Sequence, residues 1–134
     1  MRYLIIALFT AVFTMPAQAN ECDNAGTQSE MNQCADLEFA QVDSQLNEAY
    51  QELRDAYQAA DGASPALRTA QRAWVTFRDA ECAMTRISSG GTSEHMVVTQ
   101  CLSRLTAARL TDLREKLSCT EGDLSCIQLD SAAD

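Results

Sequence analysis

The stretch ADLEFAQVDSQLNEAYQELRDAYQAA, residues 35–60, decides the fold of this chain. Its apolar residues recur at alternating steps of four and three, which is the spacing of one face of an amphipathic helix. The preceding TQSE, residues 27–30, has the form of a capping box, and Asp61-Gly62 has the form of a helix stop. We therefore predict one long helix that ends at Gly62. Its apolar stripe comprises Ala35, Phe39, Val42, Leu46, Ala49, Leu53, Ala56 and Ala60, flanked by Tyr50 and Tyr57.

A second helix is predicted to begin at Ser64-Pro65, where a capping residue precedes a proline at the first helical position. The sequence SSGG, residues 88–91, ends it. We expect its apolar residues to share one buried face. These residues are Leu67, Ala70, Trp74, Phe77 and Met84, with Ile87 near the end.

A third helix is predicted to follow, capped by Thr92 or Ser93 and with Glu94 in its first turn. Arg109 interrupts its apolar stripe, so we expect this side chain to reach across to a carboxylate or to lie along the edge. The stripe itself consists of Val98, Leu102, Leu105, Leu113 and Leu117.

Short connections make successive helices antiparallel neighbours. The predicted fold class is therefore all-α: an up-down-up antiparallel three-helix bundle stapled by disulfides. It occupies residues 20–118, and residues 119–134 form a C-terminal disulfide loop and a flexible tail. No segment alternates apolar and polar residues long enough to predict a sheet.

Residues 1–19 have the three parts of a cleavable signal peptide: a positive start at Arg2, an apolar run over residues 4–13, and AQA at residues 17–19. The run is shorter than a membrane-spanning helix requires. Cys22 lies two positions too late for a lipid anchor. We expect a periplasmic or secreted protein with no membrane insertion after cleavage.

The six cysteines all lie after the predicted cleavage site, and an even number in an oxidising compartment predicts disulfides. By helix position, we expect Cys22 and Cys34 to pair with Cys82 and Cys101 in one order or the other, with a slight preference for Cys22–Cys82 and Cys34–Cys101. Cys119 and Cys126 are expected to close a small loop. No metal site is predicted, because the chain has no C-x-x-C and a single histidine, His95.

The chain carries a net charge of −9, and loss of Arg2 with the signal takes it from −9 to −10. Such a surface repels nucleic acid and anionic membranes. It attracts a basic protein partner and speeds encounter with it. The alternative is that the charge only keeps the protein in solution.

The motif AQRAWVTFRDAEC, residues 70–82, holds the densest set of aromatic and charged residues. Trp74 and Phe77 are predicted core residues. Arg78 and Asp79 are adjacent, so we expect them not to face each other. Glu81 falls on the inner face and needs a cation, either Arg78 or Arg109. These polar residues either fix the register of the helices or act in function directly.

This motif, together with TQSEMNQCA at residues 27–35 and Cys101 followed by Thr106, Arg109 and Leu113, resembles the lysozyme-inhibitor LprI-like N-terminal domain family of exported bacterial proteins. The resemblance covers nearly the whole chain after the signal. It implies a helical fold, a periplasmic location and, from the family's name, lysozyme inhibition. The residues that carry it are interpreted as fold determinants: Glu30, Asn32, Gln71, Arg72, Trp74, Phe77, Arg78, Asp79, Glu81 and Arg109.

The favoured function is a binding protein that inhibits lysozyme through the Gly/Ser-rich loop between the second and third helices. The alternative is a non-catalytic structural or interaction module of the cell envelope, which needs an exposed apolar patch containing Tyr50, Tyr57 or Val75. The alternative for the Gly/Ser-rich loop itself is that it only connects the two helices and contacts no partner. Its candidate contact residues are Ser89, Gly90, Gly91, Thr92, Glu94 and His95.

Catalysis is not expected, and neither a catalytic residue nor a cofactor is predicted. A nucleophile needs an adjacent base, whereas the cysteines are assigned to disulfides and His95 stands alone. Asp79 and Glu81 fall on different helix faces. The sequence leaves the natural partner and the oligomeric state open.

Overall fold

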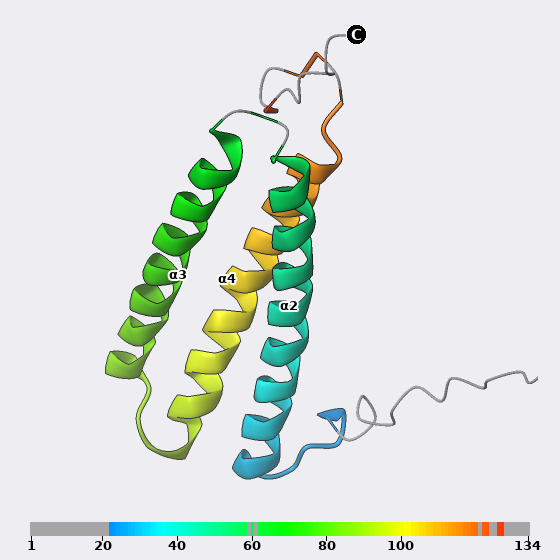
Figure 1. Ribbon diagram of the computed structural model, residues 1–134. Helices are drawn as coiled ribbons and strands as arrows, with labels where there is room; N and C mark the ends of the chain where they lie inside the picture. The colour runs from blue at the N-terminus through cyan, green and yellow to red at the C-terminus, as the bar shows by residue number, and fades with distance from the viewer. Residues whose placement is uncertain (1–21, 59, 61, 121, 124–125, 128–134) are drawn as a thin grey trace, which may run out of the picture.

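The computed structural model describes residues 22–58, 60, 62–120, 122–123 and 126–127. These contain three long helices, α2 (Gln28–Ala56), α3 (Ala63–Ser88) and α4 (Glu94–Leu117), with a short 3-10 turn, η1 (Gly91–Ser93), before α4. In Figure 1, α2 and α4 run in one direction and α3 runs in the other. The prediction of an all-α, up-down-up bundle is confirmed, and the described residues contain no strand. The predicted signal peptide lies outside the described residues.

The predicted capping box begins α2. The Thr27 hydroxyl accepts a hydrogen bond from the Glu30 backbone N–H at 3.2 Å, and the Glu30 carboxylate accepts from the N–H groups of Gly26 and Thr27, both at 2.9 Å. Hydrogen bonds from the backbone and the side chain of Thr27, and then from the Gly26 backbone, lower the pKa of Glu30. This end of α2 therefore keeps a negative charge in mildly acidic solution.

The turn between α2 and α3 differs from the prediction. Helix α2 ends at Ala56 rather than at Gly62. Tyr57 is its C-cap, and the side chain of this residue lies in the core with only 4% of its surface exposed. Gly62 is instead the N-cap of α3, with a left-handed φ of 73° that a glycine adopts without steric cost. Ser64 was wrongly predicted as the cap, since α3 begins before it.

The start of α4 also lacks the predicted side-chain cap. Ser93 occupies the N-cap position but has helical backbone angles, φ −86° and ψ −12°, and its side chain makes no capping bond. Residues 91–93 already form the 3-10 turn that leads into α4, so the turn takes the place of a hydroxyl cap. Glu94 lies in the first turn as predicted.

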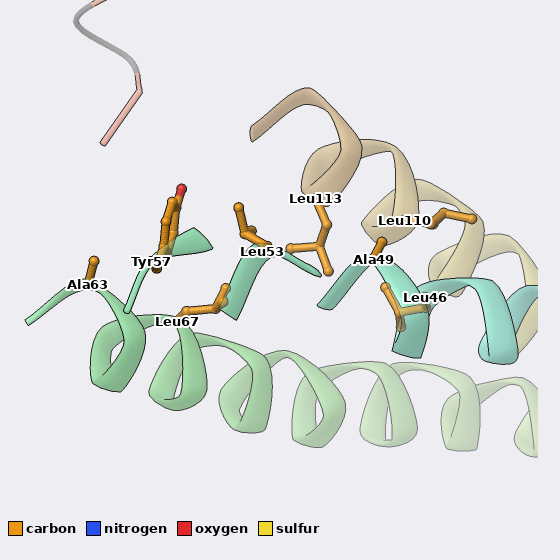
Figure 2. Close-up of a cluster of buried hydrophobic side chains, with 8 residues drawn as sticks. All are labelled: Leu46, Ala49, Leu53, Tyr57, Ala63, Leu67, Leu110 and Leu113. Atoms are coloured by element: carbon orange, nitrogen blue, oxygen red, sulfur yellow. The ribbon is translucent and has the colours of Figure 1, made fainter. Parts of the chain in front are cut away.

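The main apolar core lies near the α2–α3 turn. Figure 2 shows its side chains between the ribbons of α3 and α4. Tyr57 belongs to this core, so it is not available for an exposed patch, and burial raises the pKa of its hydroxyl. Val42, Tyr50, Trp74 and Leu117 pack against the edge. The buried members are Leu46, Ala49, Leu53, Tyr57, Ala63, Leu67, Leu110 and Leu113.

Helix α4 packs along most of α2, whereas α2 and α3 have few direct contacts. The face of α4 that is fully buried is partly polar: Thr99 and Ser103 are each 5% exposed, and Thr106 is 0% exposed. These positions continue into Leu110 and Leu113 at steps of three and four. The predicted stripe residues Val98, Leu102 and Leu105 are only half-buried. Small hydroxyl side chains thus occupy this buried face in place of larger apolar ones.

The predicted apolar face of α3 divides into two. Leu67 and Trp74 face the bundle, but Phe77, Met84 and Ile87 are 53%, 55% and 89% exposed, so their prediction as inward-facing residues was wrong. In their place Arg78 and Cys82 face inward below Trp74. The bundle therefore covers only part of the apolar surface that α3 carries.

All six cysteines form disulfides, but the predicted partners of four were wrong. Cys22 pairs with Cys34 and Cys82 pairs with Cys101, each with a Cα–Cα distance of 5.6 Å. The Cys22–Cys34 bond holds the N-terminal arm against the start of α2, and the Ala25 N–H donates to the Cys22 carbonyl in a turn of that arm, so Cys22 does not extend to α3 or α4. Ala35, rather than Cys34, is the buried residue. The Cys119–Cys126 loop is confirmed.

Proteolysis under non-reducing conditions tests this pairing. Cleavage after glutamate cuts at Glu30 and at Glu94, which separates the two cysteines of each pair. We expect linked peptides that join Cys22 to Cys34 and Cys82 to Cys101. Removal of Cys82 and Cys101 together should lower the free energy of unfolding by about 3 kcal/mol, because their bond closes a loop of 19 residues. A Cys34–Cys101 peptide would contradict the structure.

Candidate functional site

The side chain of Arg78 joins the three helices. It projects from α3, and only 12% of it is exposed. One nitrogen, Nη1, lies 3.5 Å from Asp43 Oδ1 on α2 and 3.5 Å from Thr106 Oγ1 on α4. Nε and Nη2 each lie 2.9 Å from Asp79 Oδ1. The expectation that adjacent Arg78 and Asp79 do not face each other was therefore wrong.

Aromatic rings and a second arginine complete the cluster. The Arg78 guanidinium carbon lies 5.1 Å from the Trp74 ring centre and 5.5 Å from that of Phe39 on α2. That of Arg109, on α4, lies 6.0 Å from the Trp74 ring centre. Arg109 Nε donates to Gln71 Oε1 on α3 at 3.1 Å. As predicted, Arg109 reaches across, but to an amide; the carboxylate it approaches, Asp112 at 3.9 Å, is on its own helix.

The remaining residues of the motif lie outside this cluster. Glu81 is half-buried, and its two expected partners, Arg78 and Arg109, bond to other residues instead. Phe77 faces outward and Arg72 is exposed. The contacts that this motif makes are thus mainly between helices, through Gln71, Trp74 and Arg78.

The predicted contact loop lies at the opposite end of the bundle from the main core, where Figure 1 shows the chain passing from α3 to α4. The Ser89 hydroxyl donates to the Thr85 carbonyl at 2.6 Å. Gly90, Gly91 and Thr92 are exposed, and Gly91 has a left-handed φ of 75°. The backbone N–H groups of Gly90 and Gly91 have no hydrogen-bond partner among the described residues.

Side chains from α2 hold this loop from one side. Asn32 Nδ2 donates to the Thr92 carbonyl at 3.3 Å, and Asp36 Oδ1 lies 2.7 Å from His95 Nε2. Gln28 reaches the sulfur of Met96 at 3.7 Å. These contacts join residues about 60 positions apart, so no local pattern in the sequence indicates them.

The two flanking helices hold the loop from the other side. The Cys82–Cys101 bond joins α3 to α4 behind it, and Arg86 Nε lies 3.7 Å from Glu94 Oε1 across it. The two carboxylates that hold the loop are partly exposed: Asp36, beside His95, and Glu94, beside Arg86, keep 54% and 42% of their side chains exposed. The loop is thus an exposed glycine tip held by side chains at its base.

The described residues show no group of three or more histidine, cysteine, aspartate or glutamate side chains that could hold a metal ion. Within the same part of the chain, no helix is long and apolar enough to cross a membrane.

The fold is a small, disulfide-stapled helical bundle in which a half-buried arginine cluster joins the helices and a braced loop projects at one end. Residues 19–113 match the family described as "Lysozyme inhibitor LprI". The chain belongs to this family, which is one of inhibitors rather than of enzymes. The Rhizobium meliloti (strain 1021) protein called "Uncharacterized protein R02472" is 36% identical over 124 aligned positions, covering 81% of this chain and 89% of that relative. No solved structure matches.

Replacement of Arg78 tests the cluster. We expect Arg78→Met to lower the free energy of unfolding by about 2 kcal/mol, since it removes charge-assisted hydrogen bonds and two cation–π contacts. Arg78→Lys should recover only part of the loss, because an ammonium lacks the planar fork that meets Asp43, Asp79 and Thr106 together. Urea unfolding measures both.

Arg86→Met is the matched control on the same helix. Its side chain is 62% exposed and its ion pair is long, at 3.7 Å, so we expect a change below about 0.5 kcal/mol. Equal losses of unfolding free energy in Arg78→Met and Arg86→Met would show that the contacts of Arg78 stabilise the fold no more than those of an exposed arginine.

Proposed function

We propose that this chain is an exported binding protein that inhibits a lysozyme through the loop of residues 89–95. Family membership supports the class of function. The choice of this loop as the contact site rests on one observation: Asn32, Asp36 and the Cys82–Cys101 bond hold the loop in place. A loop that is already ordered loses little conformational entropy on binding, which favours affinity.

The chemistry of the loop suits an enzyme whose cleft carries two carboxyl groups. The glycine tip presents backbone N–H donors without side chains that block their approach. A carboxylate in a cleft accepts such bonds readily. The partly exposed Asp36 and Glu94 at the base of the loop then meet the basic surface outside the cleft, where opposite charges raise the association rate.

Export is part of the proposal. Residues 1–19 have the pattern of a cleavable signal, and three disulfides are typical of an oxidising compartment. N-terminal sequencing of protein collected outside the cytoplasm should begin at Asn20. A protein that keeps Met1 and stays in the cytoplasm would contradict this part.

The inhibition test uses the protein without residues 1–19 and a panel of basic lysozymes. We expect inhibition at micromolar concentration in low salt that weakens as salt screens the charges. Glu94→Gln should weaken inhibition severalfold. Glu115→Gln, at the far end of the same helix, removes the same charge and should leave inhibition unchanged.

Two results would count against the proposal. The first is wild-type protein that leaves every lysozyme fully active at micromolar excess in low salt. The second is an equal effect of Glu94→Gln and Glu115→Gln, since net charge rather than the loop would then account for binding.

A second candidate function, a non-catalytic interaction module of the envelope, is favoured by the outer face of α3. Exposed apolar residues recur along it at steps of four and three, which is the spacing of a helix-pairing seam. Of the patch residues predicted from sequence, Tyr57 is in the core, and Tyr50 and Val75 line a groove instead. The exposed face consists of Ala66, Ala70, Ala73, Phe77, Ala80, Met84 and Ile87.

Phe77→Glu with Met84→Glu tests this module. Both side chains are more than half exposed, so the fold should tolerate the change while the apolar face is lost. We expect wild-type protein to retain a saturable partner from envelope extract and the double variant to lose it, with lysozyme inhibition unaffected. Identical recovery by both proteins would reject the face as an interaction surface.

A further inference from the structure

A groove lined by polar and apolar groups lies between α2 and α3, toward the core end and away from the loop of residues 89–95. It has a volume of about 580 Å³, within the range of small-molecule sites. It exists because α2 and α3 touch little and are joined mainly through α4 and Arg78. Its walls are Asn47, Tyr50 and Gln51 on α2, and Arg68, Gln71, Arg72, Val75 and Thr76 on α3.

The charge of this groove is opposite to that of the protein. The chain has 19 acidic residues against 10 lysines and arginines, yet the groove walls contain two arginines and no acid. Arg68 and Arg72 lie one helical turn apart on α3, and neither forms an ion pair with a described residue. Two guanidinium groups without carboxylate partners have donors free for an anion.

Amide groups in the groove are held in defined orientations. Gln71 Oε1 accepts from Arg109 at 3.1 Å, which leaves the amide nitrogen of Gln71 as a donor. Asn47 Nδ2 donates to Asp43 Oδ2 at 3.1 Å, which leaves its oxygen as an acceptor. The two partners, Arg109 and Asp43, are themselves part of the cluster around Arg78. The groove thus offers hydrogen-bonding groups of both kinds beside its two cations.

Tyr50 and Val75 add apolar surface on the two opposite walls. Tyr50 is half-buried because it packs against the main core, so its ring is held in place. A fixed aromatic ring beside amides and arginines suits a ligand with both an apolar ring face and many hydroxyl or amide groups. A sugar has these features, whereas inorganic phosphate or sulfate uses only the arginines.

We propose that this groove binds a sugar that carries a carboxylate. Arg72 and Arg68 hold the carboxylate, Gln71 and Asn47 bond to the polar groups of the sugar, and Tyr50 lies against its ring. The site goes beyond lysozyme inhibition and uses none of the loop residues, so either activity can be present without the other.

The test is a titration of the protein with two matched sugars, followed by NMR. N-Acetylmuramic acid and N-acetylglucosamine share ring and acetamido group, and only the first carries a carboxylate. We expect saturable shifts of residues 47–51 and 68–76 with N-acetylmuramic acid, and at least tenfold weaker binding of N-acetylglucosamine. Arg72→Gln should weaken the binding of N-acetylmuramic acid by about tenfold or more.

Arg104→Gln on α4 is the matched control, because Arg104 is also exposed and lies outside the groove. It should leave binding unchanged. Three results would overturn the proposal: equal binding of both sugars, equal binding of acetate, inorganic phosphate or an acetylated dipeptide, or an equal loss in Arg72→Gln and Arg104→Gln. Lysozyme inhibition should be the same in wild type and Arg72→Gln, so failure of the sugar site is distinct from failure of the inhibitory loop.

Discussion

The guanidinium of Arg78 is the contact on which the position of α3 depends. Helices α2 and α4 pack closely along their length, but α3 meets α2 at few points. Burying a cation is costly unless its charge and donors are met. Here Asp43, Asp79 and Thr106 accept its hydrogen bonds, and the rings of Trp74 and Phe39 cover its faces. Because those groups come from all three helices, the contacts of this one side chain fix the positions of α2, α3 and α4 relative to one another.

Three kinds of contact hold α3 along its length. Near the α2–α3 turn, Ala63 and Leu67 pack into the apolar core. In the middle, Trp74 and Arg78 meet α2 and α4. Toward the end, the Cys82–Cys101 bond joins α3 to α4. Phe77, Met84 and Ile87 stay exposed because Arg78 and Cys82 occupy the inward face of this part of α3. Because α2 and α3 have few direct contacts, a groove lies between them beside Tyr50. The Cys82–Cys101 bond also holds together the helix ends that the α3–α4 loop connects.

The sequence supported the helices, their order and the bundle, because capping, apolar period and breakers all agreed there. It did not distinguish the two faces of α3, since Leu67 and Trp74 lie at the same spacing as Phe77 and Met84. A search for periodic apolar residues does not detect buried polar ones. For this reason the sequence did not indicate the face of α4 on which Thr99, Ser103 and Thr106 are buried. The pairing of Cys22 with Cys34 depends on an arm that folds back, which helix positions alone do not show. The loop residues were proposed from composition, whereas their bracing by Asn32 and Asp36 is a tertiary feature. Gln71 and Arg72 belong to the motif of residues 70–82, which the sequence shows. The groove that they line could not be predicted, because its other wall is α2 and depends on how the helices pack.

The central claim is that Arg78, rather than direct apolar packing between α2 and α3, holds the middle of α3 in the bundle. Hydrogen exchange of backbone amides in wild type and Arg78→Met tests it most directly, because exchange reports the stability of each helix separately. The account predicts faster exchange over residues 72–82 of α3 in Arg78→Met, and an acceleration of the Leu46, Leu53 and Leu113 amides in the α2–α4 pair no greater than the loss of about 2 kcal/mol in the free energy of unfolding allows. Unchanged exchange over residues 72–82, or acceleration confined to the α2–α4 pair, would contradict it.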